Sequence, residues 1–147
     1  MRALIIVLFT VLMSGCAQDA LKKQTASGYP EGIFRNSNLS DVRSKLVSGC
    51  MDKGLQIEDG GSGQIVCSKE MDGLQGSLTQ LALANSYSTT PQMKVKFVSA
   101  QVGADVRVIA YPWIESTMPL GQVRKAEAKS NNDINAIQGF LNSLGAN

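Results

Sequence analysis

The sequence contains no histidine. Without an imidazole, the chain has no Ser-His-Asp or Cys-His catalytic arrangement, no histidine-ligated metal site and no side chain that ordinarily titrates near neutral pH. An excess of one charge is also lacking, since 14 Lys and Arg stand against 12 Asp and Glu, a formal net charge of +2. Nucleic-acid binding depends on clustered cationic side chains, so we expect no nucleic-acid partner.

Aromatic residues and long apolar runs are scarce as well. Aromatics make up 5% of the 147 residues, which predicts a mostly aliphatic core in a single domain. The longest apolar run, residues 3–13, is well short of the roughly 20 residues that a membrane-spanning helix needs. The sequence therefore predicts no permanent transmembrane anchor.

The N-terminus instead has the layout of an export signal. Arg2 supplies a positive charge, residues 3–13 are almost entirely apolar, and Ser14-Gly15 places small residues before Cys16. The segment Leu12–Cys16 resembles the lipobox of bacterial lipoproteins, with Met at position 13 where that family usually has Leu. The alternative is an ordinary cleaved signal followed by an incidental cysteine.

The resemblance implies a lipid anchor on Cys16. In that family a diacylglyceryl group is attached to the cysteine thiol, the signal is cut just before the cysteine, and in many species the new N-terminus is acylated. Ala17 follows the cysteine where Asp would retain an enterobacterial lipoprotein in the inner membrane. By this resemblance we expect attachment to the outer membrane, facing the periplasm, through two or more acyl chains that make a stable anchor.

The lipobox resemblance and the composition divide the chain into three segments. Residues 1–15 form the signal peptide, residues 16–37 the lipidated cysteine and a flexible tether, and residues 38–147 one α+β domain. The tether is predicted from polar and chain-breaking residues, and a flexible linker of about 20 residues has an end-to-end distance of roughly 25 Å. It would allow the domain to clear the lipid headgroups.

The mature domain combines two helical and several extended patterns. Leu39, Val42, Leu46 and Cys50 form one apolar helical stripe that starts near Asn38. We expect helices over residues 39–53 and 133–144, and strands over 55–58, 64–68, 74–86, 93–100, 106–114 and 122–128, with helix the alternative for 74–86. This order predicts an antiparallel meandering sheet of about five or six strands, with an N-terminal and a C-terminal helix packed on one face.

Cys50 and Cys67 are the two thiols that remain after lipidation. Cys50 lies on the apolar stripe of the first helix, and Cys67 shares a strand face with Ile65. In an oxidising periplasm, a pair placed in this way predicts a disulfide. Two buried free thiols are the alternative.

Tyr111, Trp113 and Ile114 are the candidate partner-binding residues. Trp and Tyr are enriched where proteins bind partners, and strand alternation places Tyr111 and Trp113 opposite the small apolar residues of the same strand. The alternative is a second small core, in which these side chains pack with Tyr29 and Phe34.

Other patterns are too general to indicate a site. The glycines of residues 60–63 precede a strand, which favours a hairpin turn over a phosphate-binding loop. Glu58, Asp59, Glu70 and Asp72 are interpreted as a solvated acidic surface rather than a catalytic or metal site. We therefore expect no metal, no cofactor and no enzymatic activity.

The sequence thus favours a lipid-anchored envelope protein that acts as a non-enzymatic binding or scaffolding module. One alternative is an exclusion or immunity lipoprotein, since the overall layout is similar to small uncharacterised lipoproteins of proteobacteria and prophages. A cell-envelope hydrolase is the weaker alternative, because histidine and a recognisable nucleophile motif are absent.

Lipidation can be tested with Cys16→Ser. We expect the intact mass of the membrane-bound protein to correspond to a chain that starts at Cys16 and carries acyl groups, and we expect Cys16→Ser to leave the membrane fraction. Cys50→Ala/Cys67→Ala is the control and should remain membrane-bound. Wild-type levels of Cys16→Ser in the membrane fraction would contradict the prediction.

Overall fold

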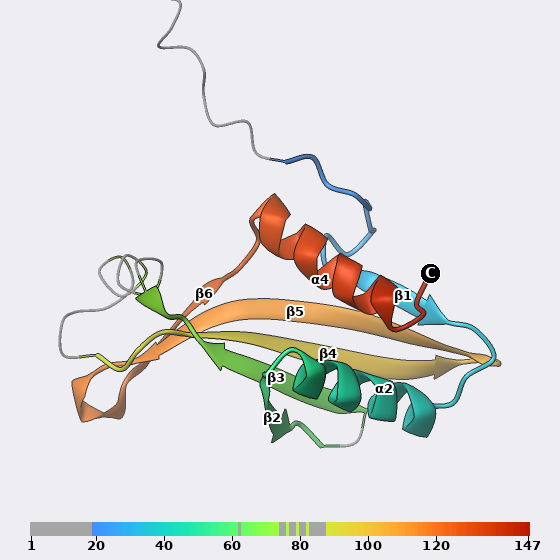
Figure 1. The fold of residues 1–147 in the computed structure, drawn as a ribbon, viewed down its shortest axis with the longest axis horizontal. Coiled ribbons are helices and arrows are strands. Elements are labelled where there is room, and N and C mark those ends of the chain that lie inside the picture. Colours follow the sequence, from blue (N-terminus) through green and yellow to red (C-terminus); the bar gives the residue numbers. More distant parts are fainter. Residues whose placement is uncertain (1–18, 62, 74–75, 77–78, 80–81, 83–87) are drawn as a thin grey trace, which may run out of the picture.

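A computed structural model describes residues 19–61, 63–73, 76, 79, 82 and 88–147 (Figure 1). Within these residues an antiparallel sheet of six strands and the two helices α2 and α4 can be followed from end to end, so the predicted α+β class is confirmed. The strands run in the order β1-β5-β4-β3-β2, and β6 also pairs with β5. The elements are β1 (Glu31–Phe34), α2 (Leu39–Asp52), β2 (Gln56–Asp59), β3 (Gln64–Glu70), β4 (Gln92–Val102), β5 (Asp105–Thr117), the 3-10 turn η1 (Pro119–Gly121), β6 (Val123–Glu127) and α4 (Asn131–Ser143).

Strand β5 is the central element of the sheet. It pairs with β4 from Asp105 to Glu115 on one side, and with β1 and then β6 on the other. Figure 1 shows β4 and β5 as the two long strands of the molecule. Every other strand is attached to this hairpin directly or through β3.

Pro112 lacks a backbone N–H, which ordinarily confines proline to an edge strand or a bulge, but β5 is an inner strand. Alternate backbone N–H groups of a strand point to the same side. The N–H of Ala110 donates to Pro30 (2.9 Å), and the carbonyl of Pro112 accepts from Ala128 (3.3 Å), so Pro112 directs its nitrogen to the side of β1 and β6. The β1 pairing ends at Ile109 and the β6 pairing begins at Trp113. The nitrogen of Pro112, which has no hydrogen to donate, therefore faces the interval between β1 and β6. No hydrogen bond to β4 is lost.

The helices begin and end where their capping residues predict. The side chain of Asn38 accepts from the N–H of Asp41 (2.9 Å) at the start of α2, and Gly54 follows that helix with φ +67°. Ser130 accepts from the N–H of Asp133 (3.2 Å) at the start of α4. The expected first helix over 39–53 and last helix over 133–144 thus correspond to α2 and α4.

The core lies between the sheet and the apolar sides of the helices. A disulfide joins Cys50 of α2 to Cys67 of β3 inside this core, as the sequence predicted. Val42 and Leu46 of α2 and Leu141 of α4 are completely buried in the same cluster. Its other buried members are Phe34, Ile65, Val95, Phe97, Val106, Val108, Ala110, Ile137 and Ala146.

Part of residues 16–37, which were expected to form a flexible tether, belongs to the sheet instead. Residues 31–34 form β1, which pairs with β5 and hydrogen-bonds through Ile33 to the C-terminal Asn147 in both directions (3.1 Å each). Gly32 fits here because a Cβ would lie 2.5 Å from the Cβ of Ala146. The strand is only four residues long and its partners are far away in the sequence, so local composition did not reveal it.

The remaining strands follow the prediction with small shifts. The hairpin over 55–58 and 64–68 is β2 and β3, and the strand over 122–128 is β6. The strand expected over 74–86 lies largely outside the described residues. The described positions among them, Gly76, Thr79 and Ala82, have helical rather than extended backbone.

Removing the disulfide tests how much it stabilises the fold. Cys50 and Cys67 are separated by 17 positions, and closing a loop of this length contributes about 3 kcal/mol in the chain-entropy account. We expect Cys50→Ala/Cys67→Ala to lower the melting temperature by roughly 10 °C. The wild type in reductant is the control and should match the variant. Equal melting temperatures of the wild type with and without reductant would contradict the prediction.

Candidate functional site

The structure separates the three predicted partner-binding residues. Lys96 and Lys94 of β4 are the register partners of Tyr111 and Trp113, and these four side chains share one face of the sheet. Val108 and Ala110 point to the other face and are buried in the core. Ile114 follows Trp113 and therefore lies on the core side, so it does not join the two aromatic rings.

Tyr111 and Trp113 form an aromatic surface together with Tyr29. The ring centroids of Tyr29 and Tyr111 are 4.7 Å apart, with the planes inclined by 56°. Lysine ammonium groups lie over the rings: Lys96 at 5.7 Å from Tyr111, Lys125 at 5.4 Å from Trp113 and Lys129 at 4.6 Å from Tyr29. We call Tyr29, Tyr111 and Trp113, with these lysines, the aromatic face.

The aromatic face is hollowed and only half-buried. A shallow pocket of about 280 Å³ is lined by Tyr29, Lys96, Tyr111, Pro112, Trp113, Lys125 and Glu127. The second small core considered as an alternative exists in part, because Tyr29 packs on Tyr111. Phe34 does not join it, since its side chain is 1% exposed within the main core.

An ion-pair network fixes the edge of the Trp113 ring. The indole N–H donates to Glu115 (3.0 Å), and Glu115 also pairs with Lys94 (3.1 Å) and Lys125 (3.3 Å). Lys94 is 9% exposed and makes a second pair with Glu58 (2.9 Å). Breaking a pair of this kind leaves an unmatched charge in a poorly solvated place, so the network holds the indole in one orientation.

The network keeps its members ionised. Burial lowers the pKa of Lys94, but hydrogen bonds and attraction to Glu58 and Glu115 outweigh it and raise the pKa above 10.5. Burial raises the pKa of Glu115, but hydrogen bonds from Trp113, Lys94 and Lys125 outweigh it and lower the pKa below 4.5. Lys94 is therefore an ammonium and Glu115 a carboxylate at neutral pH.

Ser68 lies opposite Lys94 in the sheet, a pair that the sequence did not single out. A Ser-Lys catalytic pair needs a neutral lysine that accepts the serine proton. Here Lys94 is charged, and the Ser68 hydroxyl donates to Glu58 (3.2 Å). Ser68 is also only 2% exposed. The arrangement supports a structural role for both residues.

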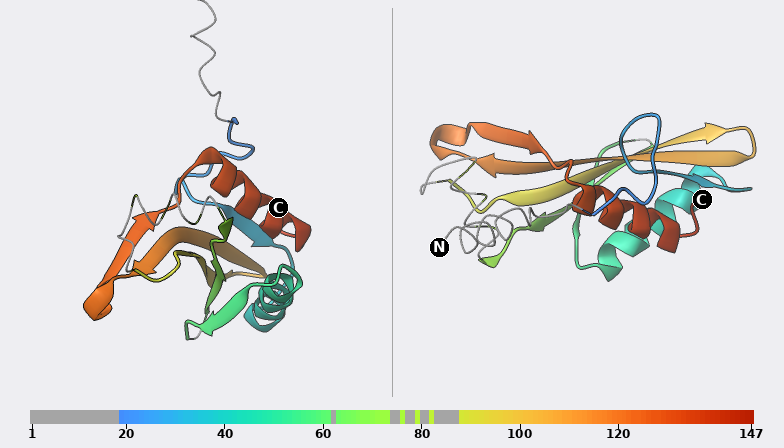
Figure 2. Two further views of the ribbon diagram at one scale, coloured as in Figure 1. Left: turned by 60° about the vertical axis from the view of Figure 1, so that its left-hand side comes forward. Right: turned by 90° about the horizontal axis from the view of Figure 1, so that it is seen from above.

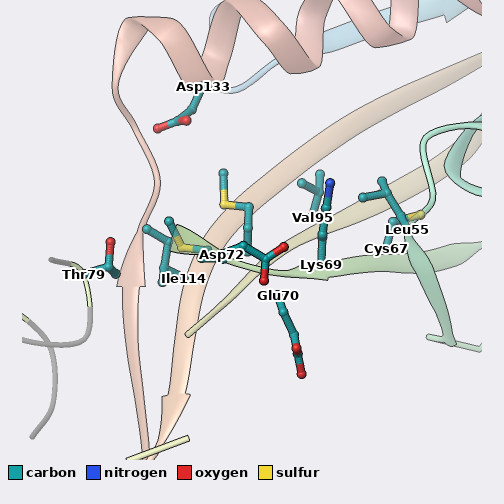
Figure 3. Close-up of a pocket in the computed structure, with 11 residues that line it drawn as sticks. Leu55, Cys67, Lys69, Glu70, Asp72, Thr79, Val95, Ile114 and Asp133 are labelled. Atoms are coloured by element: carbon teal, nitrogen blue, oxygen red, sulfur yellow. The ribbon is translucent and has the colours of Figure 1, made fainter. Parts of the chain in front are cut away.

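A second pocket, of about 450 Å³, lies on the core side of the sheet (Figure 3). Ile114, Val95 and Cys67 contribute apolar lining, and Glu70, Asp72 and Asp133 contribute carboxylates. Glu58, which the sequence analysis considered together with Glu70 and Asp72, is bound to Lys94 instead. Within the described part of the chain, no group of three or more His, Cys, Asp or Glu residues is placed to hold a metal ion.

Comparison of the chain with protein-family models, curated proteins and solved structures found no match. Among the described residues, no helix has the length and apolar character needed to cross a membrane.

Glu115→Gln tests the ion-pair network through its pH dependence. Because folding lowers the pKa of Glu115, its contribution to stability is present above the ordinary value of 4.5 and is lost as the pH falls through the folded value. We expect Glu115→Gln to be less stable than the wild type at neutral pH, and the difference to narrow below pH 4.5. Denaturant unfolding over this range measures it.

Ser99→Ala, a β4 variant without an ionisable group, is the control. Its difference from the wild type should not change over the same pH range. A constant difference between Glu115→Gln and the wild type in strong acid would contradict the proposed network.

Proposed function

We propose that this chain is a lipid-anchored cell-envelope protein that acts as a non-enzymatic binding or scaffolding module. In this proposal acyl groups on Cys16 attach it to the outer membrane, with the domain facing the periplasm, and a protein partner binds the aromatic face. The observation that carries the proposal is the half-buried pair Tyr111 and Trp113 on the sheet face opposite the core.

The anchor is supported by the sequence and by the disulfide. The lipobox-like segment ends at Cys16, and the remaining two cysteines are joined to each other. A structural disulfide is typical of proteins that fold outside the cytoplasm. Both features favour an exported protein whose third cysteine is available for lipidation.

The binding face is supported by the distribution of residues over the two sheet faces. We infer that α2 and α4 cover the same face, because Leu46 of α2 and Leu141 of α4 belong to one buried cluster with Val108 of β5 (Figure 2). Neither α2 nor α4, the two helices whose bounds the described residues give, then covers the opposite face. Aromatic residues left partly exposed on such a face are typical of contact sites.

The fixed orientation of Trp113 also favours recognition. Its indole N–H is already bound to Glu115, and Lys125 lies over the ring, so a partner meets a preformed surface. Preorganisation of this kind lowers the entropy lost on binding. Catalysis receives no comparable support, since Lys94 is held in its charged form by two carboxylates.

Site-specific photocrosslinking in intact cells tests the binding face. We expect a crosslinking amino acid at Tyr111 to give a discrete adduct with an envelope protein, and the same amino acid at Met51, an exposed position on α2, to give none. Adding Trp113→Ala should abolish the adduct at Tyr111, because truncating a binding anchor typically costs about 2 kcal/mol or more.

Ile114→Ala is the matched control, since it shortens the next side chain of β5 on the opposite face. It should lower the stability of the domain but leave the adduct unchanged. If Trp113→Ala instead lowers stability by about 3–5 kcal/mol, Trp113 is a core residue and the proposed face is wrong.

A further inference from the structure

One side of α4 carries amide side chains at helical spacing. Asn131, Asn135, Gln138 and Asn142 follow one another at intervals of four, three and four residues. Such a spacing places them on the same side of the helix. Asn135 and Gln138 are 7% and 3% exposed, which is unusual for polar residues unless they have partners. We call these four residues the amide stripe.

The partner of the amide stripe is the backbone that precedes β1. The side chain of Asn135 accepts from the N–H of Lys22 (2.8 Å) and donates to the carbonyl of Ala20 (2.9 Å). Gln138 makes the same two kinds of bond with Glu31, at 3.1 and 3.0 Å. The N-terminal segment is therefore held to α4 at residues 19–22 and again at Glu31, the first residue of β1, and the blue ribbon between these points forms a loop (Figure 1).

The first contact lies very close to the proposed lipidation site. Asn131 donates to the carbonyl of Asp19 (2.8 Å). Only Ala17 and Gln18 separate Asp19 from Cys16. Three residue steps span about 11 Å at full extension, less than half of the reach expected for a flexible tether over residues 16–37.

We propose that the domain lies directly on the phospholipid headgroup layer, with residues 19–23 and the first turn of α4 facing the membrane. This inference depends on the proposed lipidation of Cys16. The chain length outside the docked segment leaves the domain no room to stand away from the bilayer. The hydrogen bonds of the amide stripe, which we call the clamp, thus set both the distance of the domain from the bilayer and its orientation.

Apolar and charged side chains both lie beside the anchor. Leu21 is 40% exposed, and the adjacent Lys22 is also exposed. In the proposed arrangement Leu21 can enter the headgroup layer and Lys22 can pair with lipid phosphates, while the carboxylate of Asp19 lies three positions before Lys22. In Figure 1 the turn Pro119–Gly121 between β5 and β6 lies at the lower left, far from the blue segment above α4, and it is distant from the bilayer in this arrangement.

Energy transfer to the headgroups tests the arrangement on the full lipidated protein. The probe is a vesicle of phosphatidylethanolamine and phosphatidylglycerol with an acceptor on a fraction of the headgroups. A donor dye is attached at Asn132→Cys on α4 or at Gln122→Cys beside the β5–β6 turn, both exposed amide positions. We expect severalfold higher transfer efficiency from position 132, with the Cys50–Cys67 disulfide checked by mass.

Two further variants test the clamp itself. A Gly/Ser insertion of about ten residues between Gln18 and Asp19 leaves the clamp intact but adds roughly 17 Å of reach. Asn135→Leu removes both bonds to the segment without lengthening the chain. Each should reduce the transfer from position 132 towards the level of position 122.

The outcomes separate this inference from the proposed function. Protein without acyl mass overturns both proposals. Acylated protein with equal transfer from the two positions, with higher transfer from position 122, or with transfer that the insertion does not change, overturns the membrane-facing arrangement and leaves lipidation in place.

Discussion

The pairing of β4 with β5 is the interaction on which the rest of the structure depends. Eleven facing residue pairs connect these strands, the longest ladder in the sheet. Because successive side chains point to opposite faces, this one ladder supplies both sides of the molecule. Val95 and Phe97 of β4 and Val108 of β5 build the core, while Lys96 and Tyr111 face the other way.

The side of β5 that faces away from β4 accommodates a proline within a long inner strand. A proline within it would normally leave one ladder bond unmade. Here β1 and β6 share that side, and Pro112 lies in the interval between them. The same interval admits Tyr29, which precedes Pro30 and packs on Tyr111. The gap that tolerates proline thus also forms one wall of the aromatic face.

Local patterns in the sequence predicted the elements that local chemistry determines. The caps at Asn38 and Ser130, the hairpin around residues 60–63 and the alternation of β5 depend on neighbouring residues, and all of them are present. The disulfide could be predicted because Cys50 and Cys67 each lie on an apolar face of a recognisable element.

The features that the sequence analysis missed depend on distant partners. Strand β1 is four residues long, and its pairing with residues 106–109 has no local signature. The Lys94 network needs β5, β4, β3 and β2 to pair in this order before Glu58 and Glu115 reach the same ammonium. Ile114 was grouped with Trp113 by sequence proximity, although strict alternation separates the two residues. The spacing of the amide stripe is present in the sequence. The same spacing is found on the exposed polar side of a helix, and only the bound N-terminal segment distinguishes the two cases.

The N-terminal segment connects the two proposals physically. It contacts α4 first at Asp19, then at Ala20 and Lys22, and only afterwards reaches Tyr29 on the aromatic face. Under the proposed lipidation, any pull from the membrane acts on this series of bonds in the same order. The bonds from the amide side chains of α4 therefore lie between the proposed anchor and Tyr29, whose hydroxyl donates to Glu127 (3.0 Å) and whose ring packs on Tyr111.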